Sequence, residues 1–257
     1  MSTHLYCLLP ASPSGVPPEL TGIDAAVVRA LDIGAMQAWV STTEPRPEIV
    51  TNVAADAALA GIREHDAVVE RALSTGVTPL PARFGQRFRD DDACAAEIAR
   101  KADAILPLLL AVQGLVEMTL ILTPSTKRAV AELVPVLPEM VGEDPGVGRR
   151  YLEALKNREA ATGAVRQALD ALAQRLGEAA EGFVQRVSVH ENLAKMPMRA
   201  ISHLVRRDVI DSYRDAVGAV HPTTDYRFLV VGPRAPYSFA SLQASDGGSH
   251  GLRLAGP

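Results

Sequence analysis

Aromatic side chains are scarce in this chain of 257 residues, of which only 4% are Phe, Trp or Tyr. Proteins that bind single-stranded nucleic acid stack the bases on such rings, so the composition argues against this class of function. The net charge of -4 at pH 7 provides no positive field to attract nucleic acid or an anionic membrane surface. We therefore expect neither nucleic acid nor a membrane as a partner.

Cysteine is rare as well, because Cys7 and Cys94 are the only two and belong to no CxxC or Cys/His cluster. This spacing gives no metal-site motif and fits thiols that stay reduced in the cytoplasm. No basic segment followed by a long apolar run opens the chain. The longest apolar run, residues 104–112, is too short to span a bilayer and contains Pro107. These absences predict a cytoplasmic protein.

Motifs of catalysis and cofactor binding are also missing. The sequence has no nucleophile elbow, no GxGxxG and no GxxxxGK(S/T) motif. The acidic run Asp90-Asp91-Asp92 could in principle hold Mg²⁺, but consecutive carboxylates at a helix start are usually solvated caps. We expect no catalytic residue, no cofactor and no metal site.

The overall composition is typical of a globular protein with a hydrophobic core, since 47% of the residues are hydrophobic and 22% are charged. Periodicity and breaker residues define the elements of the first part. We expect strands at residues 4–9, 25–31, 34–41 and 78–83, a helix capped by Thr51 or Asn52 and ending at Gly76, and a helix over residues 90–112 kinked at Pro107. Residues 1–113 are assigned to an N-terminal α+β domain.

The second part follows a different order of elements. We expect strands at residues 115–122, 182–189, 198–205 and 226–231, a long helix from residue 147 and a short helix at 208–217. The resulting order of β, long α, β, β, α, β is the split βαβ, or ferredoxin-like, pattern. We predict an α+β fold of two domains, with the ferredoxin-like one at residues 114–240, a Pro-rich variable segment at 124–146 and a disordered tail at 241–257.

The long helix has apolar residues at a heptad-like spacing. Two interpretations are open, namely an amphipathic helix lying on a sheet and a coiled-coil contact with a partner helix. Gly163 and the absence of a fourth clean heptad favour the first. The seven positions are Leu152, Leu155, Thr162, Val165, Leu169, Leu172 and Leu176.

The last predicted strand is followed by Gly232-Pro233, which should end it because proline donates no N–H to a ladder. A second proline follows three residues later, so a rigid, extended arm leaves the sheet with two aromatic side chains, Tyr237 and Phe239. Such an arm packs on its own domain or is presented to a partner. We favour packing, because aromatic residues are core residues first.

His65 lies between Ile62 and Val69 at i+3 and i−4 spacing, on or beside the buried face of its helix. A hydrogen-bonded core histidine is the more common explanation of such a residue. The alternative is a small-molecule enzyme in which His65 and Arg83 converge on a pocket of the N-terminal domain.

Two segments resemble signatures of a known family. Residues 81–88 resemble the P-x-R-F-G-x-x-F signature of the gas vesicle protein F/L family, and residues 232–239 resemble that family's G-P-W-P-P-Y-S-F terminus. Residues 148–152 look like the family's G-x-x-Y-L. Arg234 stands where the family usually has Trp, and Ala235 where it often has Pro. The matching residues are Pro81, Arg83, Phe84, Gly85 and Phe88 in the first segment and Gly232, Pro233, Pro236, Tyr237, Ser238 and Phe239 in the second.

The resemblance runs from about residue 4 to residue 240. It implies a non-enzymatic accessory protein of gas vesicle formation, located in the cytoplasm and on the vesicle, with two α+β domains of which the second is a modified ferredoxin-like fold. It also implies binding of the small, very hydrophobic shell subunit, with other gas vesicle accessory proteins as further partners. The motif residues are candidates for partner binding or for holding the fold.

Three faces could bind such a subunit, namely an exposed β-edge, the heptad-like seam and the aromatic arm. A ferredoxin-like nucleic-acid binder ranks lowest, because the sheet face lacks paired aromatics. The residues expected there are Val184, Val187, Leu229 and Val231.

Overall fold

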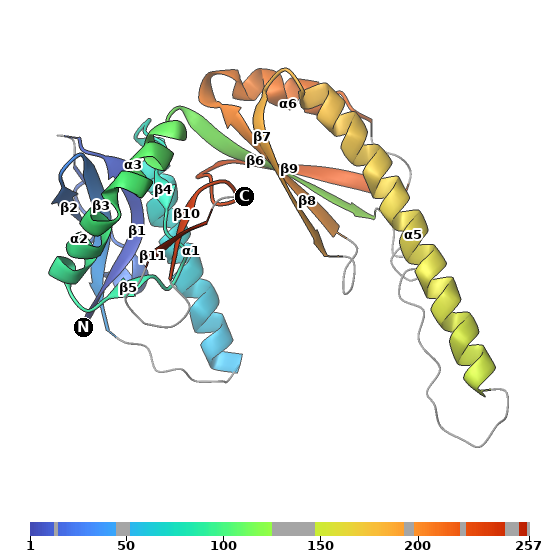
Figure 1. The fold of residues 1–257 in the computed structure, drawn as a ribbon, viewed down its shortest axis with the longest axis horizontal. Helices are drawn as coiled ribbons and strands as arrows, with labels where there is room; N and C mark the ends of the chain where they lie inside the picture. Colours follow the sequence, from blue (N-terminus) through green and yellow to red (C-terminus); the bar gives the residue numbers. More distant parts are fainter. Residues whose placement is uncertain are drawn as a thin grey trace. The chain divides into compact units, whose positions relative to one another are not determined.

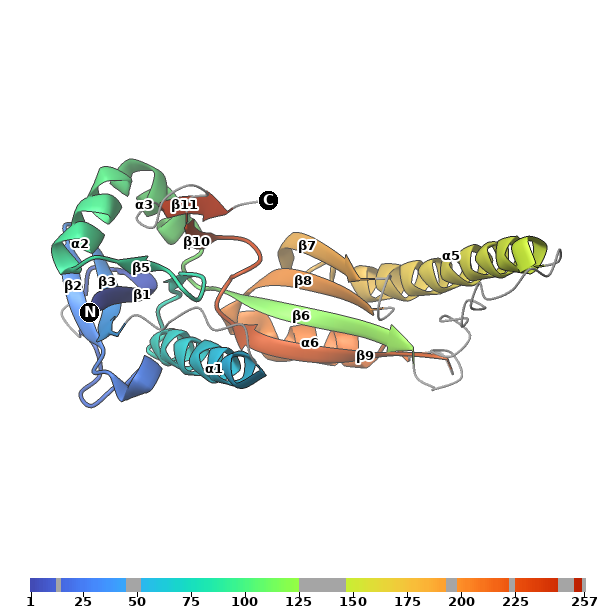
Figure 2. The ribbon, with the colours of Figure 1, turned by 90° about the horizontal axis from the view of Figure 1, so that it is seen from below.

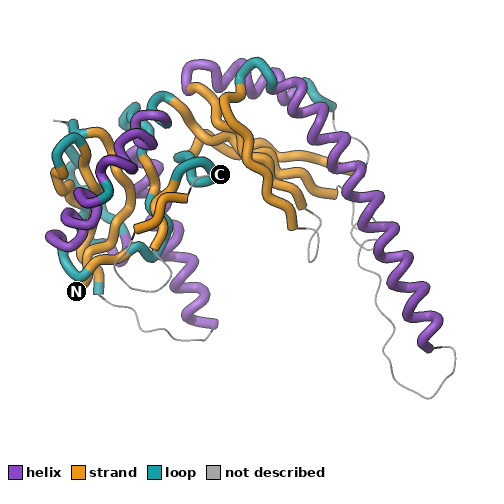
Figure 3. The backbone as a smooth tube through the Cα atoms, viewed as in Figure 1, coloured by secondary structure: helices purple, strands orange, loops and turns teal. Residues whose placement is uncertain are grey.

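The computed structural model describes residues 1–12, 15–44, 52–124, 147–192, 198–221, 225–244 and 252–255. These residues form two units, one made of residues 1–117 with 233–257 and the other of residues 118–232. The chain enters the second unit along β6 (Leu115–Pro124) and leaves it along β9 (Tyr226–Arg234). Figure 3 distinguishes the helices from the strands of both units.

The first unit is built around β1 (Ser2–Pro10). On one side β1 pairs antiparallel with β3 (Met36–Thr43), which in turn pairs with β2 (Arg29–Ile33). On the other side it pairs with two short strands in succession, β4 (Leu80–Pro81) and β5 (Arg87–Phe88). All interior residues of β1 are buried, as expected for a strand with both faces of its sheet covered.

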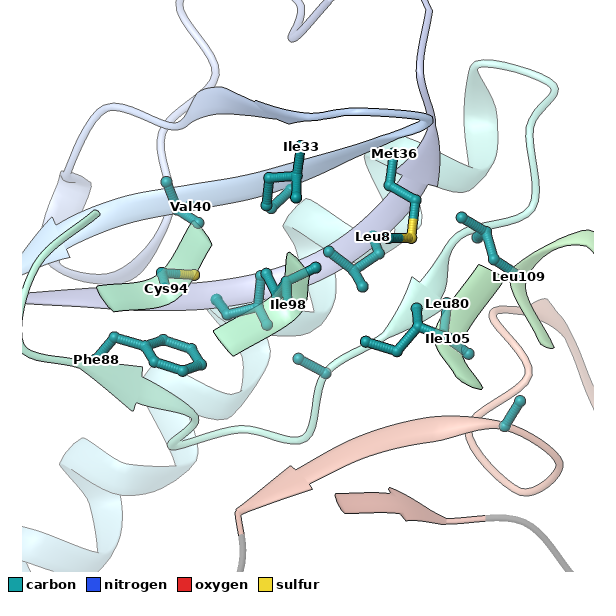
Figure 4. Close-up of a cluster of buried hydrophobic side chains, with 14 of the residues drawn as sticks. Leu8, Ile33, Met36, Val40, Leu80, Phe88, Cys94, Ile98, Ile105 and Leu109 are labelled. Carbon is teal, nitrogen blue, oxygen red and sulfur yellow. The ribbon is translucent and has the colours of Figure 1, made fainter. Parts of the chain in front are cut away.

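Helices cover the two faces of this sheet (Figures 1 and 2). On one face lies α1 (Asn52–Ser74), and on the other lie α2 (Asp91–Arg100) and α3 (Ala102–Ala111). The α1 face includes Tyr6, Leu9, Ile23, Trp39, Val68, Val69 and Ala72. The core on the α2 and α3 face, drawn in Figure 4, includes Leu8, Met36, Val40, Leu80, Phe88, Ile98, Ile105 and Leu109. The strand predicted at residues 34–41 corresponds to β3, whose two faces contribute to different cores: Trp39 belongs to one, and Met36 and Val40 belong to the other.

The helix predicted over residues 90–112 is two helices. Asp90 caps the first, since its side chain accepts a hydrogen bond from the Ala93 N–H at 2.8 Å. The interruption falls at Lys101, whose φ of −106° and ψ of 10° leave the helical region. Pro107 was expected to mark the kink but lies inside α3.

The strand predicted at residues 25–31 is also displaced. A 3₁₀ turn, η1 (Ile23–Ala25), stands at its start, and β2 begins only at Arg29. Asp24 and Ala25 both have φ of 55°, which no β-strand accommodates. Apolar content alone did not reveal this left-handed turn.

The second unit has its strands in the order β7-β8-β6-β9. Its other elements are α5 (Val147–Ala180), β7 (Val184–Asn192), β8 (Met198–Arg206), the 3₁₀ turn η2 (Arg207–Val209) and α6 (Ile210–Gly218). The core formed with the two helices includes Met118, Leu120, Leu122, Leu169, Leu172, Leu176, Ile201, Val205, Tyr213 and Val217. The strand predicted at residues 115–122 is confirmed as β6, in which the even-numbered apolar positions are the buried ones.

Among the side chains of α5 that the structure describes, those packed in the core lie in its second half. Leu169 and Leu176 are fully buried, whereas Leu152 is 59% exposed. Asp170 of α5 forms an ion pair with Arg199 of β8 at 2.5 Å, and the helix continues past the ends of the strands (Figure 1). The predicted amphipathic helix on a sheet is thus confirmed for residues 165–180. None of the helices in the described ranges combines the length and hydropathy that a bilayer span needs.

The C-terminal region differs from the prediction in two respects. Strand β9 does not stop before Gly232-Pro233 but continues to Arg234, which proline permits because β9 is an edge strand. The tail expected to be disordered contains β10 (Ser241–Ala244) and β11 (Leu252–Ala255), which pair antiparallel. Most of the Pro-rich segment at 124–146 lies outside the described residues.

Candidate functional site

The first motif, residues 81–88, folds as two short strands and a turn along β1. Pro81 lies opposite Cys7 in the ladder between β4 and β1. Phe88 lies opposite Thr3 in the ladder between β5 and β1 and is 2% exposed. Both ends of the motif are therefore part of the central sheet of the first unit.

The middle of the motif is a turn that leaves the sheet. The Gln86 N–H donates to the Arg83 carbonyl at 3.3 Å, and Gly85 has φ of +90°. Glycine adopts this conformation without a steric penalty. The turn exposes Arg83 and leaves Phe84 36% exposed, with the Phe84 ring 6.0 Å from those of both His4 and His65.

His65 connects helix α1 to this motif. Its Nε2 lies 2.8 Å from the Ala82 carbonyl oxygen, and because a carbonyl only accepts, Nε2 carries the proton. The Nδ1 atom is then an acceptor, and it receives the Nε2–H of His4 at 2.9 Å. One chain of hydrogen bonds therefore runs from β1 through α1 to the first motif.

Burial keeps both imidazoles neutral. It lowers the pKa of His4 to about 2, with the charges of His65 and Arg87 as smaller causes. Burial also lowers the pKa of His65, although its hydrogen bond to the Ala82 carbonyl acts in the opposite direction. The neutral forms are the ones that the hydrogen-bond chain requires.

The prediction of a hydrogen-bonded core histidine at position 65 is confirmed. His65 is 1% exposed, and both of its ring nitrogens are engaged, so neither is available to move a substrate's proton. Arg83 is exposed on the turn. The geometry therefore gives no support to the alternative of a pocket in which these two side chains act as catalysts.

Tyr6 is a second polar anchor of this region, and sequence reasoning missed it together with His4. The Tyr6 hydroxyl oxygen accepts the Ile23 N–H at 2.9 Å and lies 2.8 Å from the Ser41 hydroxyl. A Cβ at Gly22 would lie 2.0 Å from that hydroxyl oxygen, so this position requires glycine. The available signal was the alternation of His4 and Tyr6 within an otherwise apolar strand.

The second motif, residues 232–239, is called the terminal arm here. Arg234 lies 3.4 Å from an oxygen of Asp66 and 3.6 Å from one of Glu70, both on α1. The Tyr237 hydroxyl donates to the other Asp66 oxygen at 3.1 Å. Burial and the Asp66 charge raise the pKa of Tyr237, so it remains a hydrogen-bond donor.

The end of the terminal arm is held by a carboxylate and by burial. Both the N–H and the hydroxyl of Ser238 donate to Glu117, at 2.8 and 2.7 Å. Phe239 and Ala235 are each 1% exposed. We favoured packing of the arm on its own domain, which was predicted at residues 114–240. Phe239 is buried as expected, but the arm belongs to the first unit and not to the unit whose strand it continues.

The two motifs meet at α1. His65 holds the first motif, and the next residue, Asp66, holds the terminal arm. Segments separated by about 150 positions in the sequence are therefore fastened to adjacent residues of one helix. Their geometry is that of residues that hold the unit together, whereas the turn residues Arg83, Phe84 and Gly85 of the first motif are exposed.

The remaining candidate residues have structural partners. Asp91 receives the Arg29 side chain at 2.5 Å and the Thr3 hydroxyl at 2.6 Å. Within the described ranges no three His, Cys, Asp or Glu residues group as metal ligands would. The predicted G-x-x-Y-L segment, residues 148–152, forms the start of α5.

Comparison with known proteins gives a consistent result. A sequence model described as "Gas vesicle synthesis protein GvpL/GvpF" matches residues 2–241. "Gas vesicle protein F" of Streptomyces sp. (strain CB03234) is 29% identical over 248 residues, covering 93% of this chain and 99% of the relative.

Solved structures share the fold at lower identity. The crystal structure of gas vesicle protein GvpF from Microcystis aeruginosa aligns with a TM-score of 0.66 and 19% identity, over 92% of this chain and 98% of that one. The structure of GvpF from Anabaena sp. PCC7120 aligns with a TM-score of 0.65 and 15% identity, over 92% and 94%. Both have the same mixed arrangement of helices and sheets.

Proposed function

The chain belongs to the GvpL/GvpF family of gas vesicle synthesis proteins, and from this premise we propose that it binds the hydrophobic shell subunit of the gas vesicle and assists its assembly or nucleation. The accessory role in gas vesicle formation follows from family membership. The partner and the mechanism are the proposal. Other gas vesicle accessory proteins are proposed as further partners, and the cytoplasm and the vesicle as the place of action.

The proposal rests on the observation that both family motifs form hydrogen bonds that stabilise one unit. Both motif segments form hydrogen bonds within the chain, to His65 at 2.8 Å and to Glu117 at 2.7 Å. An arrangement of this kind suits a binding protein with a rigid frame. A highly apolar subunit would aggregate if left free, so covering its surface before assembly is a physical task for such a frame.

The fold offers a frame with two parts, which we propose are the two domains. The second part has the element order β, α, β, β, α, β and the strand order β7-β8-β6-β9. This combination supports a modified ferredoxin-like fold, with both helices on one face of the sheet. Among the described residues of this unit, no helix lies on the opposite face of the sheet.

That helix-free face is the one that we propose for the shell subunit. Leu229 of β9 is 61% exposed, while its neighbours Phe228 and Val230 pack in the core under the helices. Because neighbours on a strand point to opposite faces, Leu229 belongs to the helix-free side. The terminal arm already packs within the first unit, and the packed half of the heptad-like seam already packs on the sheet of the second unit.

Co-purification with the shell subunit tests the proposal. We expect the wild-type chain to keep the subunit in solution and Leu229→Glu to lose it. Leu152→Glu, at the similarly exposed position of α5, is the matched control and should retain it. Loss in the Leu152 variant alone would move the binding face to α5, and failure of the folded wild type to retain a dispersed subunit would refute the proposed function.

A further inference from the structure

Strand β7 is an edge of the second sheet as far as the described residues extend. Two of its valines are unusually exposed, Val187 at 55% and Val189 at 52%. An edge strand also presents a row of N–H and C=O groups that no neighbouring strand satisfies. Two exposed β-branched side chains on such an edge are the usual elements of a strand-pairing surface.

The register explains why these valines are uncovered. Val187 lies opposite His203 and Val189 opposite Ile201, and Ile201 belongs to the core under the helices. Opposed residues share a face, so both valines lie on the helix side of the sheet. Helix α5 packs along β8, as its Asp170–Arg199 ion pair indicates, and leaves the outermost strand open.

A shallow hollow adjoins this edge within the second unit. Its volume is about 520 Å³, and its lining includes Glu178, Glu181 and Arg186 as well as Gly177, Val184, Val187 and His203. An apolar side chain placed beside Val187 from outside would lie at the mouth of this hollow. The edge therefore offers two valines and a recess for a further side chain, and no strand among the described residues pairs with its outer side.

We propose that two copies of this chain associate through β7, with the two strands antiparallel about a two-fold axis at Ser188. A symmetric interface of this kind uses the same patch twice and so must be complementary to itself. The inference is independent of the proposed function, because it requires only a second copy of the chain.

Self-complementarity selects this register over its neighbours. An axis at Ser188 places Val187 opposite Val189 of the second copy, so both valines meet a valine, while Arg186 faces His190. An axis at Val187 would instead place Val189 opposite Gln185. An axis at Val189 would place Val187 opposite position 191, a glutamate. Paired β-branched side chains stabilise a sheet, so the register centred on Ser188 is favoured.

The size of the contact sets the expected strength of association. One strand pair with two valines from each copy buries less surface than a permanent dimer does, which usually exceeds about 2,000 Å² in total. We therefore expect a reversible dimer that forms in the micromolar range.

Disulfide cross-linking tests the register directly. In the proposed pairing Ser188 of one copy faces Ser188 of the other, at a Cα separation of about 5 Å that a disulfide can bridge. A mild oxidant should therefore link Ser188→Cys chains into dimers. The native thiols do not compete, because Cys7 and Cys94 are buried and burial raises the pKa of each, that of Cys94 to about 12.

Matched cysteines on the same face of β7 provide the control. In the proposed dimer a cysteine at position 186, or at position 190, is offset by four residues from the same cysteine in the second copy, which is roughly 13 Å along the strand. Neither Arg186→Cys nor His190→Cys should therefore cross-link alone. A mixture of the two variants should cross-link, because positions 186 and 190 face each other. Equal cross-linking of all three single variants would overturn the register and the proposal with it.

Sedimentation of the full chain measures the association itself. We expect a concentration-dependent dimer whose dissociation constant rises at least about tenfold in Val187→Lys/Val189→Lys. Leu229→Lys, an equally exposed position on the opposite edge strand, should leave it unchanged. A wild-type chain that stays monomeric throughout the micromolar range, or a dimer that is lost only in the Leu229 variant, would refute the proposal.

Discussion

The carboxylate of Glu117 accepts two hydrogen bonds from Ser238, one from the backbone N–H at 2.8 Å and one from the hydroxyl at 2.7 Å. Glu117 lies near the start of β6, where the chain leaves the first unit, and Ser238 lies in the terminal arm, where it has returned. The contact therefore joins the two passages of the chain within the first unit. Its acceptor is charged, which makes such hydrogen bonds stronger than neutral ones.

We predict that Ser238→Ala lowers the free energy of unfolding of the first unit by about 1–2 kcal/mol, because it removes one hydrogen bond to a charged acceptor and keeps the backbone one. Urea denaturation followed by near-ultraviolet circular dichroism, with Trp39 as the buried reporter, measures this loss. A double-mutant cycle with Glu117→Ala should give a coupling energy of similar size. Coupling near zero would mean that the hydroxyl contributes nothing in solution.

Acid should destabilise the first unit before its carboxylates titrate. The pKa of His4 is lowered from 6.5 to about 2 by burial, so below pH 6.5 the unfolded chain takes up a proton that the folded chain does not. The contribution of His4 to the free energy of unfolding is therefore fully present above this pH and decreases as the pH falls below it. Between pH 7 and 5.5 the loss from His4 is about 1 kcal/mol, and His65, whose pKa is also lowered, adds to it.

Urea denaturation at pH 7, 6.5, 6 and 5.5 measures this dependence. His4→Gln keeps an N–H that can donate to His65 and removes one titrating group. We expect it to reduce the loss of stability over this pH interval by about 1 kcal/mol. An unchanged pH dependence in this variant would contradict the neutral His4–His65 pair.

Much of the fold was accessible from the sequence because its elements have strong local periodicity. The alternating apolar residues of β6 and the heptad-like spacing of α5 predicted both elements and their buried faces. The misplaced elements depend on backbone conformation instead. The left-handed residues Asp24 and Ala25 are not glycines, although Gly22 precedes their turn. The interruption at Lys101 has no proline or glycine beside it, so no breaker residue marked it.

The sequence identified the motif residues of the candidate site, but it did not predict which residues they contact. The family signatures identified the residues that turned out to be fastened, and the helical spacing of His65 indicated a buried partner. The partners themselves lie far away in sequence. The separation between Tyr237 and Asp66 is 171 positions, and no pattern in a single sequence connects such residues. The alternation of His4 and Tyr6 in β1 marks two polar positions on one face of the strand, but it does not identify His65, Ser41 and Ile23 as their partners.

Gly85 should be replaceable only at a cost in backbone energy. Its φ is +90°, and nothing lies within 4 Å of the position that a Cβ would occupy, so Gly85→Ala introduces strain without a steric clash. We expect a loss of about 1–2 kcal/mol in unfolding free energy, measured by urea denaturation. Gly163→Ala is the matched control, because that glycine has equally open surroundings in the middle of α5.

The control should change stability in the opposite direction. Alanine in a helix interior is favoured over glycine by about 0.5–1 kcal/mol, so Gly163→Ala should stabilise the second unit. A neutral Gly85→Ala variant would show that the turn between Arg83 and Gln86 relaxes easily. In that case the glycine of the first motif would have to be explained by something other than its conformation.

The terminal arm should depend on Phe239 far more than on Arg234. Phe239 is 1% exposed, so Phe239→Ala creates a cavity and should cost about 3–5 kcal/mol. Arg234 is 42% exposed, and its nearest carboxylate oxygens lie at 3.4 and 3.6 Å, so Arg234→Ala should cost less than about 1 kcal/mol. Urea denaturation of the two variants measures both values. Arg234 stands where the family usually has Trp. A loss above about 2 kcal/mol in Arg234→Ala would mean that its ion pairs with α1 hold the arm in place of that ring. Charge rather than burial would then hold the arm in this chain.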